Sequence, residues 1–183
     1  MHRGLFACIV YNRLSVIQDA PAHNQTAINR KYATMSDRRV LIAYAHPDDE
    51  SFGLGGVIPK LIDEGADVYL ICATDGDVGT IPEDMQGQYD SIRELRLSEL
   101  DCAAEVLRLK HVYTFGYKDS GMMGSSDNDD PDCLWYNWQN KPEAVTRRVV
   151  EVMREIQPQV VITFNKYGGY GHPDHIAIQQ ATT

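Results

Sequence analysis

The sequence has little of what disulfide-rich proteins and cysteine-ligated metal proteins need. Its 183 residues include four cysteines, which lie far apart and form no Cys-x-x-Cys pair. A disulfide framework and a thiolate zinc site are therefore disfavoured. Cys72 lies in an apolar run and Cys102 in a helical pattern, so both are expected to be buried free thiols. This cysteine usage is typical of a protein of the reducing cytoplasm.

The sequence also lacks an excess of positive charge and any long apolar run. Its net charge of -9 argues against nucleic acid or an anionic membrane as a partner. No segment approaches the ~20 apolar residues of a membrane-spanning helix. Residues 4–10 (GLFACIV) resemble a weak signal-peptide core, but Arg13 and the polar stretch that follows argue against export. Residues 1–35 are predicted to be a poorly ordered N-terminal extension, and residues 36–183 are predicted to form one domain.

Beyond residue 36, apolar segments of strand length alternate with helical patterns. Strands are predicted at 40–45, 67–73, 111–115 and 159–164, and helices at 52–64, 91–109 and 143–156. Strands that are apolar throughout and separated by helices predict a parallel sheet covered on both faces. The predicted fold class is therefore α/β, a three-layer Rossmann-like sandwich with a mostly parallel sheet.

Polar motifs follow each of the predicted strands. They are AHPDDE (45–50), TDGD (74–77), GYKDSGM (116–122) and NKYGGYGHPDH (165–175). Because the carboxyl ends of parallel strands meet at one edge of a sheet, these motifs are expected to share a site. The Gly/Ser/Asp-rich segment 119–132 is expected to be a lid or binding loop. A nucleotide-binding Rossmann domain is disfavoured, because no Gly-x-Gly-x-x-Gly follows the first strand.

Histidines and acids recur at a spacing that suits metal binding. His46 and Asp49 are three residues apart, as are His172 and His175, so each pair falls on one face if it begins a helix. His46, Asp49 and His175 would supply two nitrogens and one oxygen and leave a position for water, as in catalytic zinc sites. Such a set could also hold ferrous iron. A single cluster of this kind could equally cap a helix N-terminus, but two clusters that end two strands favour a metal.

The paired motifs AHPDDE and GGYGHPDH resemble the zinc-dependent N-acetylglucosaminyl deacetylases of the LmbE-like or PIG-L family. RLSEL (96–100) and GYKDSGM are similar to the family's intermediate segments. The resemblance runs from about Val40 to the end of the chain, and implies a fold that is C-terminally incomplete, since family members continue further. It also implies a role for each matching residue. The implied metal ligands are His46, Asp49 and His175; the implied catalytic residues are Asp48, Tyr170, His172 and Asp174; and the implied substrate contacts are Arg96 and Asp119.

By the same resemblance, Asp48 is the general base, while Tyr170 and His172 stabilise the developing oxyanion. Asp174 is expected to orient His172 and keep it charged. The implied function is that of a metal-dependent amidohydrolase, which deacetylates an N-acetylated amino sugar, a GlcNAc-type conjugate, by attack of metal-activated water on the amide carbonyl. A thiol conjugate or another N-acyl compound stays open as the substrate. The alternative is a non-catalytic metal- or sugar-binding module, or an inactive fragment of such an enzyme. The sequence does not indicate an oligomeric state.

Overall fold

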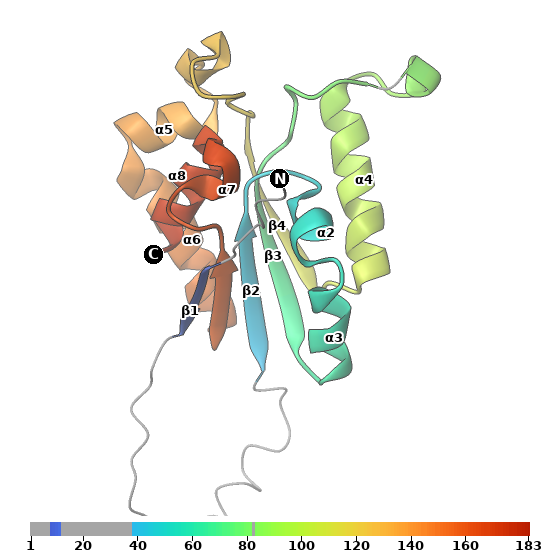
Figure 1. The fold of residues 1–183 in the computed structure, drawn as a ribbon, viewed down its shortest axis with the longest axis vertical. Helices are drawn as coiled ribbons and strands as arrows, with labels where there is room; N and C mark the ends of the chain where they lie inside the picture. Colours follow the sequence, from blue (N-terminus) through green and yellow to red (C-terminus); the bar gives the residue numbers. More distant parts are fainter. Residues whose placement is uncertain (1–7, 12–37, 82) are drawn as a thin grey trace, which may run out of the picture.

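The computed structural model describes residues 8–11, 38–81 and 83–183. They form one sheet with helices on both faces, which confirms the predicted three-layer α/β class (Figure 1). The strands are β1 (Cys8–Tyr11), β2 (Arg39–Tyr44), β3 (Asp67–Thr74), β4 (His111–Tyr117) and β5 (Val160–Thr163). The helices are α2 (Asp49–Leu54), α3 (Val57–Asp63), α4 (Ile92–Leu107), α5 (Leu134–Asn140), α6 (Pro142–Ile156), α7 (Gly168–Gly171) and α8 (Pro173–Thr182), with short 3-10 turns η1 (Glu83–Met85) and η2 (Ser126–Asp129).

The strand order in the sheet is β1-β5-β2-β3-β4. β5, β2, β3 and β4 run parallel, whereas β1 pairs antiparallel with β5. β2 lies between β5 and β3 and is buried from Val40 to Tyr44, as expected for a strand covered on both faces. Helices α2, α3 and α4 lie on one face of the sheet, and α5, α6 and α8 lie on the other (Figure 1). The carboxyl ends of β2 and β5 are therefore neighbours, and this fixes the position of the site.

Two sequence-based expectations about local structure were wrong. The helix expected over 52–64 is broken into α2 and α3, because Gly55 and Gly56 stand at the junction and glycine is a poor helix former. Cys102 is exposed on α4, whereas Cys72 is a buried free thiol as expected. The start of α4 is as predicted, since the Ser91 side chain caps the helix by accepting the backbone N–H of Glu94 at 3.2 Å.

The N-terminal extension is described only in part. Of residues 1–35, the structure describes residues 8–11, which form β1, and the rest lie outside the described residues. The proposed boundary between extension and domain therefore stays a prediction. In the part of the chain that the structure describes, no helix has both the length and the apolar character needed to cross a membrane.

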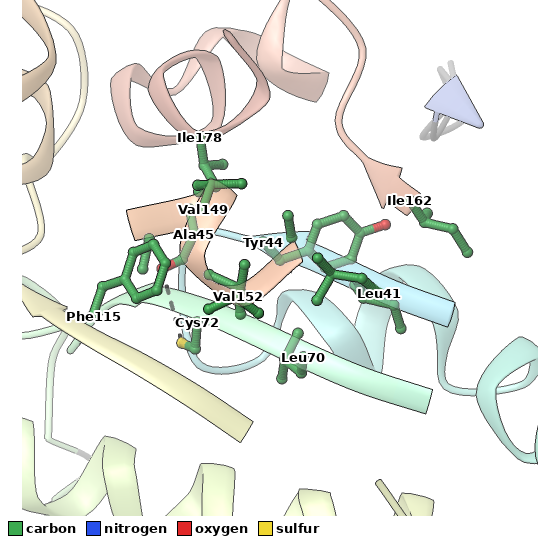
Figure 2. Packing of buried hydrophobic residues seen from close by; sticks show 14 of the residues in the cluster. Leu41, Tyr44, Ala45, Leu70, Cys72, Phe115, Val149, Val152, Ile162 and Ile178 are labelled. Atoms are coloured by element: carbon green, nitrogen blue, oxygen red, sulfur yellow. Dashed lines mark hydrogen bonds between the residues drawn. The ribbon is translucent and has the colours of Figure 1, made fainter. Parts of the chain in front are cut away.

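The hydrophobic core reaches up to the carboxyl edge of the sheet. Side chains of β2, β3, α6 and α8 pack together, among them Leu41, Leu70, Val149 and Ile178 (Figure 2). Burial of each such aliphatic side chain contributes about 1.5–3 kcal/mol to folding. At the top of this core Tyr44 stacks on Phe164, with ring centroids 4.5 Å apart. The packing thus gives a rigid base to the loops that follow β2 and β5.

Candidate functional site

Three side chains from two neighbouring strand ends converge on one point. His46 follows β2, Asp49 begins α2, and His175 lies in the first turn of α8, beyond β5. His46 Nδ1 lies 3.1 Å from His175 Nε2. Asp49 Oδ2 lies 3.4 Å from His46 Nδ1, and Asp49 Oδ1 lies 3.4 Å from His175 Nε2. The structure thus brings together the three residues for which the sequence suggests a ligand role.

The outer hydrogen bonds of the two histidines determine which nitrogen faces the centre. His175 Nδ1 lies 3.2 Å from the carbonyl oxygen of Gly168, so this nitrogen must carry the proton that it donates. His46 Nε2 lies 3.1 Å from Asp174 Oδ2, and an ionised carboxylate again requires a donor. The lone pairs of His46 Nδ1 and His175 Nε2 then face each other beside the Asp49 carboxylate. Such a cluster of acceptors is stable only with a positive charge between them, either a proton or a metal ion.

The donor separations also fit a metal ion. Tetrahedral zinc has bonds of about 2.0–2.1 Å to nitrogen and oxygen, which places its ligand atoms about 3.3 Å apart. The three separations of 3.1, 3.4 and 3.4 Å agree with that spacing. Both histidines are buried, and Asp49 is partly buried. The residues present therefore fit a small divalent cation with two imidazole ligands and one carboxylate.

The pKa values of the two histidines are shifted in opposite directions. Burial disfavours the charged form of His46, but hydrogen bonds with Asp119, Asp174 and Asp49 outweigh it and hold the His46 pKa well above its usual value. For His175 burial dominates and lowers the pKa to about 4. One proton shared between His46 Nδ1 and His175 Nε2 satisfies the cluster, and a divalent cation would take the position of that proton.

Asp48 lies beside this centre and adopts an unusual backbone conformation. It precedes α2 with φ 113°, a left-handed conformation that is strained for a residue other than glycine. Its Oδ2 accepts a hydrogen bond from Arg96 Nη2 at 2.9 Å, and Arg96 Nη2 also donates to the carbonyl oxygen of Pro47. Burial and the neighbouring charge of Asp49 raise the Asp48 pKa, and Arg96 opposes the shift. A half-exposed carboxylate with a raised pKa, held next to the centre, is suited to accept a proton.

The family resemblance implies that Arg96 contacts the substrate, and this role stays a prediction. In the structure Arg96 lies against Asp48. It lines a hollow of about 360 Å³ together with Asp48 and Phe52. The Phe52 side chain is 87% exposed, so this hollow has an aromatic wall next to the carboxylate. Arg96 can therefore position Asp48 and face a ligand in the hollow at the same time.

His172, Asp119 and Asp174 form a second group that overlaps the first. Ligand atoms of His46, His172 and His175 lie within 4.8 Å of one another, as do those of His46, Asp119, His172 and Asp174. Asp119 Oδ2 lies 3.6 Å from His46 Nε2, and Asp119 Oδ1 lies 3.8 Å from His172 Nε2. Asp119 therefore stands between the two imidazoles, at the inner end of the loop that follows β4.

The expected pairing of Asp174 with a charged His172 does not match this geometry. The Asp174 carboxylate lies 3.1 Å from His46 Nε2 but 3.9 Å from His172 Nδ1. His172 Nδ1 instead accepts the backbone N–H of Asp174 at 3.2 Å, which requires this nitrogen to be unprotonated. Burial, followed by the charge of His46, lowers the pKa of His172. His172 is therefore set up as a neutral imidazole whose Nε2–H can donate.

Tyr170 lies at the outer rim of the site. Its side chain is 57% exposed, and its ring centroid lies 5.0 Å from that of His175 and 6.1 Å from that of His172. It is close enough to meet a ligand above the histidines. The structure gives it no hydrogen bond to them in the described residues, so its role stays a prediction.

Sequence reasoning missed two residues that hold the site together. Gly168 supplies the carbonyl that orients His175, and Ser120 is fully buried against Asp174. Both lie inside motifs that the sequence singled out, GGYGHPDH and GYKDSGM. The glycine pair was the one available signal for Gly168, because adjacent glycines mark left-handed backbone.

Replacement of Gly168 by alanine is expected to destabilise the protein and weaken metal binding. Gly168 has φ +68°, and a Cβ there would lie 2.8 Å from Ile176 Cγ1 and 3.0 Å from His175 Cβ. We expect Gly168→Ala to cost about 1–3 kcal/mol of unfolding free energy, measured by urea denaturation. Gly87→Ala is the matched control, since Gly87 has φ +80° with nothing near its Cβ position. Equal losses in the two variants would show that packing against His175 is unimportant.

The chain matches a known protein family over most of its length. The model of the family PIG-L, described as GlcNAc-PI de-N-acetylase, matches residues 41–183. The chain belongs to the PIG-L family. Its relatives in this family include a 1D-myo-inositol 2-acetamido-2-deoxy-alpha-D-glucopyranoside deacetylase from Thermomonospora curvata, 40% identical over 156 residues, which are 80% of this chain and 52% of the relative. The protein of the same name from Kineococcus radiotolerans is 40% identical over 160 residues, 79% of this chain and 44% of the relative.

Among solved structures, N,N'-diacetylchitobiose deacetylase from Pyrococcus horikoshii superposes with a TM-score of 0.60 at 25% identity, covering 90% of this chain and 58% of that one. The chain spans about half the length of the curated PIG-L relatives that it matches. Membership of the family and the fold are thereby established.

Proposed function

We propose that this PIG-L protein is a metal-dependent amidohydrolase, which removes the acetyl group from an N-acetylated amino sugar. The observation that supports this most is the arrangement at the strand ends. Two imidazole lone pairs and the Asp49 carboxylate lie 3.1–3.4 Å apart, and a second carboxylate, that of Asp48, is close enough for its pKa to respond to the charges of Asp49 and His46. A site that only stores a metal has no need of an additional strained acid beside its ligands.

The proposed chemistry divides the roles among the residues described above. A divalent cation held by His46, Asp49 and His175 would lower the pKa of a water molecule and polarise the amide carbonyl. Asp48 accepts the proton of the attacking water and then delivers it to the departing amine. His172 donates its Nε2–H to the oxyanion that develops on the carbonyl oxygen. We propose zinc as the cation because of the nitrogen-rich set, with ferrous iron as the alternative.

The surroundings of Asp48 favour a sugar as the ligand. The hollow beside it is about 360 Å³ in volume, is lined by Asp48 and Arg96, and is flanked by the exposed ring of Phe52. Polar hydrogen-bonding groups and an aromatic face together suit a sugar ring, which has hydroxyls and apolar C–H faces. Asp119, and Arg96 with its remaining donors, are the proposed contacts of the sugar hydroxyls, and Tyr170 would cover the acetyl end.

The relatives suggest which sugars to test. Two relatives at 40% identity are named deacetylases of 1D-myo-inositol 2-acetamido-2-deoxy-alpha-D-glucopyranoside, and the matched solved structure is named an N,N'-diacetylchitobiose deacetylase. We propose a small GlcNAc-type conjugate of this kind as the substrate. No role for nucleic acid or a membrane is part of the proposal.

The test is an assay of free amine release from three compounds: the inositol conjugate, N,N'-diacetylchitobiose and N-acetylglucosamine. We expect release that stops when a chelator removes the metal and returns when Zn²⁺ or, without oxygen, Fe²⁺ is added back. Elemental analysis of the purified protein identifies the metal that it holds. Bound metal with no amine release from any of the three would contradict the sugar deacetylase and favour a metal- or sugar-binding module.

A further inference from the structure

A buried hydroxyl lies behind the metal centre without touching the proposed ligands. Ser120 is 0% exposed and lies in the loop after β4. Its Oγ donates to Asp174 Oδ1, and its backbone N–H donates to Asp174 Oδ2 at 2.9 Å. One residue thus supplies a hydrogen bond to each oxygen of this carboxylate.

Asp174 itself is completely buried, and its carboxylate in turn restrains the His46 imidazole. Its side chain is 0% exposed, and its Oδ2 lies 3.1 Å from His46 Nε2. A buried carboxylate needs donors on its oxygens, because burial without them is strongly unfavourable. Ser120 and His46 together meet that need. The carboxylate is therefore held on one side by Ser120 and holds the imidazole of His46 on the other.

The orientation of the Ser120 hydroxyl is also determined. Its Oγ accepts the backbone N–H of Trp135, in the first turn of α5, at 2.9 Å. Because an amide N–H can only donate, the hydroxyl lone pair is used there and its proton is available for Asp174. The hydrogen bond from α5 thus orients the Ser120 hydroxyl so that its proton points to the Asp174 carboxylate.

We propose that Ser120 is a positioning residue of the metal centre, which acts through Asp174 to keep the Nδ1 lone pair of His46 directed at the cation. The chain of contacts runs from Trp135 through Ser120 and Asp174 to His46. It extends the outer hydrogen bonding of a metal ligand by one residue beyond the usual carboxylate–histidine pair. The inference rests on the proposed metal centre but not on any choice of substrate.

The test measures the affinity of the full chain for Zn²⁺ by competition with a chromophoric chelator. Outer hydrogen-bond partners typically contribute 10–100-fold to metal affinity. We expect Asp174→Asn to weaken Zn²⁺ binding by about 10–100-fold, and Ser120→Ala by about 10-fold, at the lower end of that range because it acts one contact further out. If Ser120 acts through Asp174, Ser120→Ala should have about twofold or less further effect in the Asp174→Asn background.

A matched control separates positioning from general stability. Thr163 is also 0% exposed, and its hydroxyl donates to the carbonyl oxygen of Ala43 at 2.9 Å and not to Asp174. Thr163→Val should lower stability to denaturant while leaving the Zn²⁺ affinity within about twofold. Ser120→Thr retains the hydroxyl and should recover affinity relative to Ser120→Ala.

A second measurement on the unmutated protein guards against variants that do not fold. Long-range ¹⁵N–¹H spectra of the Zn²⁺-loaded protein should show His46 protonated on Nε2. Protonation of His46 on Nδ1 would overturn the proposal, and so would an unchanged Zn²⁺ affinity in Ser120→Ala. It would also be overturned if the losses of Zn²⁺ affinity in Ser120→Ala and Asp174→Asn multiplied in the double variant, or if the folded, unmutated chain bound no Zn²⁺. Because these readouts need no substrate, a protein that behaves as expected here but releases no amine would refute the proposed function alone.

Discussion

Asp48→Asn is expected to reduce amine release by about 10²–10⁴-fold, the usual contribution of a general base. The amide has almost the same shape as the carboxylate, but it cannot take a proton from water. Asp48 is half-exposed, and its carboxylate accepts a hydrogen bond from Arg96 rather than from a proposed ligand, so Zn²⁺ affinity should change little. The measurement is kcat for the best of the three sugars, with Zn²⁺ affinity determined on the same sample.

Glu99→Gln is the matched control for this change. Glu99 is a second carboxylate paired with Arg96, with Oε2 at 3.9 Å from Arg96 Nε, and it lies one turn along α4. Its loss removes the same charge close to the same arginine without touching the proposed proton path. A similar fall in kcat for both variants would mean that Asp48 acts only through the local charge. Undiminished turnover in Asp48→Asn would show that the base is another residue.

The sequence was sufficient to predict which segments meet at the site. The motifs AHPDDE and NKYGGYGHPDH each follow a strand that is apolar throughout, and parallel strands bring such ends to one edge. The periodicity does not state that β2 and β5 are adjacent, yet the structure places them side by side. The shared edge predicted a common site, and the adjacency explains why His46 and His175 approach to 3.1 Å.

What the sequence could not provide is the choice of partner for each polar side chain. Asp174 is two residues from His172 in the chain, which made that pair the natural expectation. In the fold, His46, which follows β2, lies closer to the Asp174 carboxylate than His172 does. Ser120, in the loop after β4, also donates a hydrogen bond to this carboxylate. Such choices depend on contacts between residues far apart in sequence. Local spacing carries no information on them, and the same holds for Arg96, whose partner Asp48 is 48 positions away.

The second large effect is expected when Asp49 loses its charge. Zn²⁺ binding to the folded state alone should stabilise the unmutated protein by about 2.7 kcal/mol at a free concentration one hundred times the dissociation constant. For a protein of this length that corresponds to a rise of about 5–11 °C in Tm. Asp49→Asn should lose most of this rise, because a neutral amide is a poor zinc ligand and two imidazoles are left.

The metal-free form of Asp49→Asn should stay folded, and this makes the test informative. Asp49 Oδ2 accepts the backbone N–H of His46 at 2.8 Å, and the amide oxygen can keep that hydrogen bond. The amide N–H₂ can donate to the imidazole lone pairs that otherwise face a proton or a cation. Asp63→Asn serves as the control. Asp63 ends α3, is exposed and is paired with Arg108, and it lies near the amino end of β3, at the edge of the sheet opposite the site. If the Zn²⁺-dependent rise in Tm persists in Asp49→Asn and equals that of Asp63→Asn, Asp49 is not a ligand, and the proposed site of His46, Asp49 and His175 is wrong.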